Sequence, residues 1–99
     1  MKVELSGNAE ADLRSIVDWI APDNPAAARA LSQQLRLSCS ALSRLPKRFP
    51  LVRRVNGRDL RKRAHGSYLI FYTIWDNRVE ILRIVHGSRD WAALLVDDA

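Results

Sequence analysis

The sequence contains very little cysteine and glycine. Of its 99 residues only Cys39 is a cysteine, so no disulfide can form within the chain, and a reducing compartment is expected. The four glycines are scattered at positions 7, 57, 66 and 87, which excludes a glycine-rich phosphate-binding loop. Histidine and cysteine never occur in pairs at the spacing of a zinc site. The sequence therefore predicts no bound metal and no cofactor.

Long apolar runs are also missing. No stretch approaches the roughly 20 residues that cross a membrane as a helix, and residues 1–5 lack the apolar core of a signal peptide. The length is that of one domain. We therefore expect a single cytoplasmic domain over residues 1–99, without membrane contact.

Acidic residues are scarce in one stretch, between Arg44 and Arg63. It contains a single acid, Asp59, and has a net charge of +8, whereas the rest of the chain sums to −3. A solvated surface is the usual reason for a charge run, but this polarity indicates an acidic partner. The nine basic residues are Arg44, Lys47, Arg48, Arg53, Arg54, Arg58, Arg61, Lys62 and Arg63.

The first half of the chain has helical periodicity. Val3 and Leu5 alternate with charged residues and predict a short opening strand. Apolar residues from Leu13 to Ile20 then recur at helical spacing, with Asn8 as the expected cap. Pro22 is expected to end this helix.

A second helix is predicted to begin directly afterwards. Asn24 as the cap and Pro25 at the first helical position are a strong start signal. We expect the helix to end before Pro46 and to pack against the first helix as an antiparallel hairpin. Its apolar stripe consists of Ala28, Leu31, Leu35, Cys39, Leu42 and Leu45.

The second half of the chain has strand periodicity. Residues 49–57 predict a loop or an irregular strand, and residues 65–67 and 76–77 have turn chemistry that favours hairpins. Strands are predicted at about 59–64, 68–75 and 78–85, followed by a short helical turn over 90–96 that carries Trp91, Leu94 and Leu95. The predicted fold is α+β with the order β-α-α-β-β-β, in which the helical hairpin covers one face of a mainly antiparallel sheet.

An ordered set of local motifs resembles the ParE/RelE superfamily of bacterial toxin–antitoxin systems, and its ParE branch in particular. The resemblance covers nearly the whole chain, and each motif alone is weak. The motifs are residues 11–16, Asn24-Pro25 with Ala28, Leu45-Pro46, Leu60-Arg61, residues 68–72 and the closing segment Ile81-Leu82-Arg83-Ile84-Val85-His86-Gly87-Ser88-Arg89-Asp90.

This resemblance implies a toxin that a ParD-like antitoxin neutralises. ParE-branch toxins are associated with inhibition of DNA gyrase, which blocks replication and growth. RelE-branch toxins instead cut mRNA in the ribosome. We therefore expect a gyrase inhibitor that acts by binding, with a ribosome-dependent endoribonuclease as the alternative.

The candidates for metal-free RNA cleavage are Arg61, Arg83 and His86, because such cleavage needs a proton-transfer group and cations near the phosphate. Arg61 and Arg63 share a face of their strand by period two, and Lys62 points the other way. Arg83 shares a face with Val79, Ile81 and Val85 if its strand is regular. The resemblance also implies a terminal tyrosine for a RelE-type nuclease, and no tyrosine follows His86. A catalytic role is therefore not favoured.

Partner binding is the favoured use of the exposed cations and aromatics. Trp19 lies off the main apolar stripe of its helix and is the best candidate for a partner-facing aromatic. A plain nucleic-acid-binding module is the least favoured alternative, because the basic stretch lacks alternating exposed aromatics. The candidate partner-binding residues are Trp19, Arg54, Arg58, Arg61, Arg63, Arg83, Arg89 and Trp91.

Overall fold

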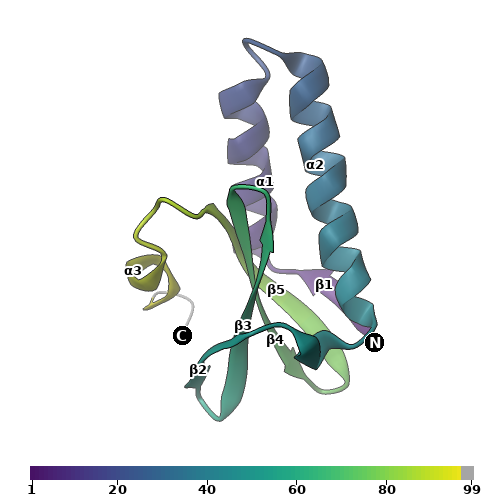
Figure 1. Ribbon diagram of the computed structural model, residues 1–99, viewed down its shortest axis with the longest axis vertical. Coiled ribbons are helices and arrows are strands. Elements are labelled where there is room, and N and C mark those ends of the chain that lie inside the picture. The colour runs from purple at the N-terminus through teal and green to yellow at the C-terminus, as the bar shows by residue number, and fades with distance from the viewer. Residues whose placement is uncertain (97–99) are drawn as a thin grey trace.

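A computed structural model describes residues 1–96 of the chain. A helical hairpin stands on one face of a five-stranded sheet, and a short third helix lies on the other side (Figure 1). The elements in chain order are β1 (Lys2–Leu5), α1 (Gly7–Ile20), α2 (Pro25–Ser40), the 3₁₀ turns η1 (Ala41–Ser43) and η2 (Pro46–Arg48), β2 (Leu51–Val55), β3 (Arg58–His65), β4 (Tyr68–Trp75), β5 (Arg78–His86) and α3 (Trp91–Val96).

The sheet has the order β1-β5-β4-β3-β2. β2 to β5 form an antiparallel meander, and β1 adds to it in parallel with β5, from Lys2 opposite Arg78 to Leu5 opposite Ile81. The predicted α+β class with a helical hairpin on one face is confirmed. The predicted C-terminal helical turn is also present as α3, and its Leu95 is buried.

The segment 49–57 contains a strand, β2, whose pairing with β3 shifts register between Leu51 and Arg53, so the second predicted alternative, an irregular strand, is confirmed. Asn56 and Gly57 both have positive φ, 52° and 78°, as a type I′ hairpin turn requires. The turn pairs β2 with β3 through Val55 opposite Arg58. Asn-Gly is the strongest short-range hairpin signal. This dipeptide therefore indicates the hairpin between β2 and β3, which the side-chain periodicity of residues 49–57 does not.

The first helix begins earlier than its predicted cap, Asn8. Ser6 is the N-cap, and its Oγ accepts a hydrogen bond from the backbone N–H of Ala9 at 3.1 Å. The same hydroxyl donates to the carbonyl of Leu82 in β5. Ser6 therefore caps the helix and ties it to the sheet at once, which makes it the better cap.

The second helix ends at Ser40, before the predicted end near Leu45. The chain tightens into η1, and Leu45 then adopts a left-handed backbone with φ 50° and ψ 54°. Pro46 disfavours a right-handed helical conformation at the residue before it. Leu45 is 72 % exposed and does not belong to the buried stripe. The predicted cap at Asn24, with Pro25 after it, is confirmed.

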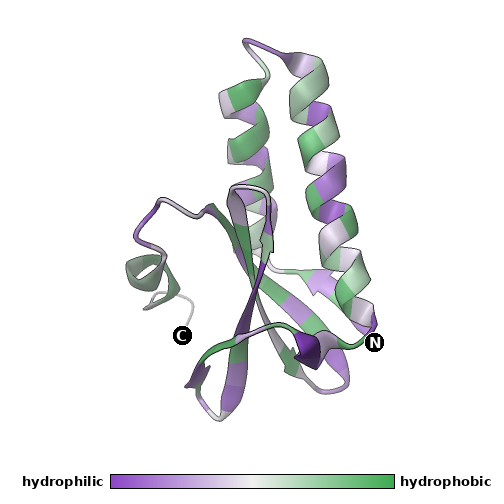
Figure 2. Ribbon diagram, in the orientation of Figure 1, coloured by the Kyte–Doolittle hydropathy of each residue, from purple (hydrophilic) through white to green (hydrophobic). Residues whose placement is uncertain are grey.

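Two apolar clusters hold the layers together on opposite faces of the sheet. Between the helical hairpin and the sheet lie Ala9, Leu13, Leu35, Cys39, Leu42, Ile70, Tyr72, Val79, Ile81 and Ile84. Under α3 lie Leu60, Phe71, Val85 and Leu95. In Figure 2 the hydrophilic colouring gathers on β3 and η2. The basic stretch contributes to both clusters, because Phe49 packs against the first and Val52 and Val55 pack against the second.

A β-bulge in β5 overturns the prediction that Arg83 shares a face with Val79 and Ile81. Tyr72 pairs with Ile81 but its neighbour Phe71 pairs with Arg83, so Leu82 is the extra residue. Val79, Ile81 and Ile84 pack against the helical hairpin, whereas Val85 packs under α3. The extra residue shifts the alternation of side chains by one position.

In the part of the chain that the structure describes, none of the helices has the length and apolar character needed to cross a bilayer.

Candidate functional site

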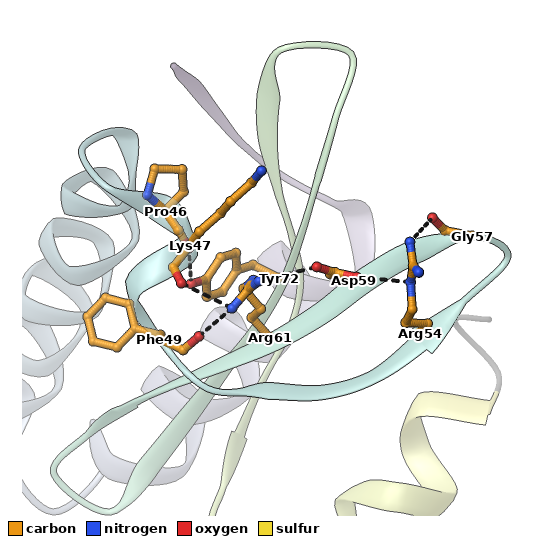
Figure 3. A network of polar contacts seen from close by, with 8 residues as sticks. All are labelled: Pro46, Lys47, Phe49, Arg54, Gly57, Asp59, Arg61 and Tyr72. Atoms are coloured by element: carbon orange, nitrogen blue, oxygen red, sulfur yellow. Dashed lines mark hydrogen bonds and ion pairs between the residues drawn. The ribbon is translucent and has the colours of Figure 1, made fainter.

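Arg61 organises a loop that we call the basic loop, residues 44–50 (Figure 3). Its Nη1 donates to the carbonyl oxygens of Lys47 at 3.1 Å and Phe49 at 2.8 Å. Its Nη2 donates to Asp59 Oδ2 at 3.2 Å. Only 14 % of the side chain is exposed. The hydrogen bonds of Arg61 therefore fix the basic loop on β3.

Tyr72 provides a second anchor for the basic loop. Its hydroxyl donates to the carbonyl oxygen of Pro46, and its ring is fully buried under the helical hairpin. Burial raises the pKa of Tyr72 above its ordinary value, since the phenolate would lose its hydration, although the positive charges of Arg61 and Arg63 act in the opposite sense. At neutral pH the hydroxyl is therefore protonated and available as a donor.

Asp59, the single acid of the basic stretch, is shared by two arginines. Its Oδ1 lies 3.1 Å from Nε of Arg54, and its Oδ2 lies 3.2 Å from Nη2 of Arg61. Arg54 also donates to the carbonyl oxygen of Gly57 at 3.4 Å, and 70 % of its side chain is exposed. Arg54 therefore combines an internal ion pair with access to a partner.

The alternation predicted for β3 is confirmed by the contacts of Lys62 and Arg63. Arg63 reaches the helical hairpin, where Nη1 donates to the carbonyl oxygen of Ser38 at 2.9 Å. Lys62 reaches the other face, where Nζ lies 5.2 Å from the ring centre of Trp91. Trp91 in turn packs on Phe71, with ring centres 5.2 Å apart. This strand therefore places positive charge on both faces of the sheet.

Arg83 binds α1. Its Nε lies 2.9 Å and its Nη2 3.0 Å from the two carboxylate oxygens of Asp12. Asp12 also accepts the backbone N–H of Ile84 at 2.8 Å, so one carboxylate holds both the side chain and the edge of β5 beyond the end of β1. The side chains are 15 % and 13 % exposed. This bidentate pair joins helix and sheet.

His86 lies at the end of β5 and bonds locally. Its Nδ1 accepts the backbone N–H of Ser88 at 3.1 Å and lies 2.7 Å from the Ser88 hydroxyl. The imidazole ring also meets Tyr68 edge to face at 5.4 Å. The three nuclease candidates Arg61, Arg83 and His86 thus contact three different parts of the chain, and the structure does not turn them toward one shared point.

Arg58 takes part in a stack that the sequence did not indicate. Its guanidinium lies 4.4 Å from the ring centre of Trp75, and that of Arg78 lies 4.0 Å from the same ring. Trp75 and Arg78 face each other across the turn at 76–77. The two-residue turn could have revealed that pair, because it places its flanking residues opposite each other. The stack gives this end of the sheet a cationic surface.

Two of the predicted partner-binding residues are exposed on the surface. Trp19, near the end of α1, is 83 % exposed, and Arg89 lies exposed after β5. Trp91 is half-buried beneath Lys62. A shallow groove of about 180 Å³ runs beside the helical hairpin, lined by Leu13, Arg14, Val17, Asp18, Ser32 and Arg36. The hairpin therefore offers both an exposed aromatic and a groove to a partner.

No cluster of three metal-ligating side chains occurs among residues 1–96. Cys39 is a free thiol that is fully buried under the helical hairpin. Burial raises its pKa from the ordinary value of 9.0 to about 11. The arrangement thus contains arginines bonded within the fold, exposed cations and one exposed indole. The exposed groups are of the kind that bind a partner.

Comparisons with known proteins agree with this arrangement. Residues 3–91 match the family model described as the ParE toxin of the type II toxin–antitoxin system parDE. No sequence among curated proteins matches this chain significantly.

Three solved structures share the fold. A chain of the chromosomal ParDE toxin–antitoxin system from P. aeruginosa superimposes with a TM-score of 0.72 at 19 % identity, over 87 % of this chain and 95 % of that one. A chain of the RelBE2 toxin–antitoxin complex from Mycobacterium tuberculosis gives 0.56 at 27 % identity, over 89 % and 92 %. A chain of the archaeal RelE–RelB complex from Pyrococcus horikoshii OT3 gives 0.50 at 18 % identity, over 89 % and 96 %.

The fold and the family match define a toxin of the ParE/RelE superfamily. Within that superfamily the chain belongs to the ParE toxin family of type II toxin–antitoxin systems.

Proposed function

We propose that this toxin inhibits DNA gyrase by binding to it in the cytoplasm, and so blocks replication and growth. We further propose that a ParD-like antitoxin keeps it silent. Membership of the ParE family over residues 3–91 supports both parts. The similar chain from P. aeruginosa belongs to a ParDE system, which supports an antitoxin as the partner.

The observation that carries a binding mechanism is the use of Arg61 and Arg83 inside the fold. Arg61 holds two backbone carbonyls of the basic loop, and Arg83 holds Asp12 on α1. Metal-free cleavage requires cations that meet the developing charge on one phosphate. Freeing either guanidinium for that task would break bonds that connect the sheet to its surroundings.

The residues that we propose to contact partners are therefore the accessible members of the predicted set. These are Trp19, Arg54, Arg58 and Arg89. Arg63 and Trp91 are half-buried, and Arg61 and Arg83 are bonded inside the fold. Exposed arginine and tryptophan are the residue types that most often dominate the energy of protein interfaces.

A supercoiling assay with purified gyrase tests the proposed target. The toxin is expected to inhibit supercoiling at micromolar concentration or to trap the gyrase–DNA cleavage complex, and added antitoxin is expected to reverse the effect. Full supercoiling activity at micromolar toxin, with no trapped complex, would contradict the proposal.

A ribosome-dependent endoribonuclease is the second candidate. The 27 % identity to a chain of the RelBE2 complex favours keeping it, together with the cationic strand that carries Arg61, Lys62 and Arg63. A translation reaction programmed with a defined mRNA separates the two candidates. Intact mRNA after incubation with the toxin eliminates the nuclease, and cleavage within the ribosomal A site establishes it.

A further inference from the structure

Leu45 in the basic loop has an unusual conformation for a large apolar residue. Its φ of 50° lies in the left-handed region, which residues with bulky side chains rarely adopt. Its side chain is also 72 % exposed. Backbone strain persists only where the surroundings impose it, and such positions cluster at binding sites.

The surroundings of Leu45 impose this conformation through the carbonyl groups that follow it. Tyr72 holds the carbonyl of Pro46, and Arg61 holds those of Lys47 and Phe49 (Figure 3). The amino group of Met1 also donates to Ser43 just before the basic loop, at 3.1 Å. The loop is thus fixed from inside, and Leu45 is presented outward in a preformed arrangement.

An apolar hollow of about 310 Å³ lies beside Leu45. Its walls are Met1, Leu45, Pro46 and the side chains of Lys47 and Arg48, and the lining is almost wholly apolar. At about 30 Å³ per water molecule the hollow has room for roughly ten waters, which is enough for one large apolar side chain. Met1 is 47 % exposed, so two large apolar side chains face solvent here.

The charge around the hollow indicates what covers it. The chain has no acidic residue between Asp23 and Asp59, and exposed cations stand within or next to the lining in the sequence, namely Lys2, Arg44, Lys47 and Arg48. An apolar centre flanked by Lys47 and Arg48 complements a segment that carries an apolar side chain beside carboxylates. Nucleic acid would pair with these cations but would leave the apolar centre unused.

We propose that this hollow receives an apolar side chain from an acidic segment of the antitoxin, whose carboxylates lie against Lys47 and Arg48. The inference rests on the proposed function, because it takes the antitoxin as the partner. It adds a docking point at the base of the helical hairpin, away from Trp19 near the end of α1.

The test uses the full toxin with Leu45→Gly and the purified antitoxin encoded beside it. Glycine adopts φ 50° without strain, so the urea midpoint is expected to stay the same or rise. The same substitution removes a wall of the hollow, so the Kd for the antitoxin is expected to rise about tenfold or more. Leu45→Asn, which also tolerates this backbone region, is the second variant and is expected to weaken binding alike. Leu37→Ala is the matched control, because Leu37 is 69 % exposed on α2.

Each other outcome overturns the inference in a distinct way. An unchanged Kd for both Leu45 variants removes the hollow as a docking point and leaves the proposed function intact. A wild-type toxin that fails to bind the antitoxin overturns the inference and the antitoxin part of the proposed function together. If Lys47→Glu with Arg48→Glu abolishes binding to random double-stranded DNA but leaves antitoxin affinity unchanged, these cations bind nucleic acid and the inference is wrong.

Discussion

Among the arginines, the internal ones differ from the exposed ones in what they bind. Arg61 and Arg83 donate to groups of the fold itself, with only 14 % and 15 % of their side chains exposed. Arg54 and Arg58 keep more contact with solvent. The sequence could mark all four as cations on or near strands, but it could not tell them apart. The difference depends on carbonyl and carboxylate groups supplied by segments distant in the sequence.

Asp12→Ala is expected to destabilise the toxin strongly. The change removes the carboxylate that accepts from the Arg83 guanidinium and from the N–H of Ile84, and breaking one side of a buried pair costs about 3–5 kcal/mol. Urea unfolding followed by circular dichroism measures the loss in the free energy of unfolding.

Glu10→Ala is the matched control on the same helix. Its pair with Arg36 is bidentate, but the two side chains are 37 % and 50 % exposed, and exposed pairs contribute about 0–1 kcal/mol. Equal losses for the two variants would show that Asp12 has no special role.

Cys39 is expected to resist thiol reagents in the folded state. The side chain is fully buried and burial raises its pKa to about 11, so the reactive thiolate is scarce at pH 8. Labelling with a chromogenic disulfide should be slow without denaturant and complete in concentrated urea. Rapid labelling of the folded toxin would contradict the packing of Cys39.

The same shift in pKa makes stability depend on pH. The unfolded thiol loses its proton near its ordinary pKa of 9.0, before the folded thiol does at about 11. The contribution of Cys39 is therefore complete below about pH 9 and is lost as pH rises from there to about 11. Cys39→Ala should remove this part of the pH dependence.

At the scale of elements, the sequence predicted most of the strands because turn chemistry and period two act locally. β4 has its predicted bounds, β3 is longer than predicted by one residue at each end, and β5 is longer by one residue at its end. β2 was predicted only as one of two alternatives, a loop or an irregular strand, because its side chains do not alternate clearly, although Asn56 and Gly57 marked its turn. The bulge at Leu82 lies where α1 contacts β5, next to the hydrogen bond from the Ile84 N–H to Asp12. This contact joins distant parts of the sequence, so no local sequence pattern predicts it.

α3 is too short to be stable alone, because isolated helices shorter than about 12 residues are marginal in water. It is held by packing of Trp91 on Phe71 and of Leu95 in the second cluster. Trp91→Ala is therefore expected to cost about 2–3 kcal/mol and to speed amide exchange over residues 91–96. Urea unfolding and hydrogen exchange measure the two effects.

Trp19→Ala serves as the control for α3, since this indole is 83 % exposed. Its effect on the free energy of unfolding should stay within about 0.5 kcal/mol. Unchanged amide exchange over α3 in the Trp91 variant would mean that other contacts hold this helix.

At the scale of the whole molecule, the helical hairpin extends well beyond the sheet (Figure 1), and Trp19 lies toward its far end. We expect Trp19→Ala to weaken antitoxin binding about tenfold or more, because an exposed indole is a typical anchor of an interface. Isothermal titration calorimetry with the purified antitoxin measures the change. Equal affinities for the wild type and the variant would exclude Trp19 from the interface.

The pairing of β1 with β5 joins the first strand of the described chain to its last strand, from Lys2 opposite Arg78 to Leu5 opposite Ile81. At about 5–20 residues per second, a ribosome needs about 4–15 s to proceed from the first of these strands to the last. During this interval the sheet that covers the apolar face of the helical hairpin is incomplete, because β5 supplies Val79, Ile81 and Ile84 to the core between them. β1 can therefore take its place in the sheet only after β5 has been synthesised. Antitoxin that is already present when synthesis of the toxin begins has this interval in which to reach the chain before the sheet is complete.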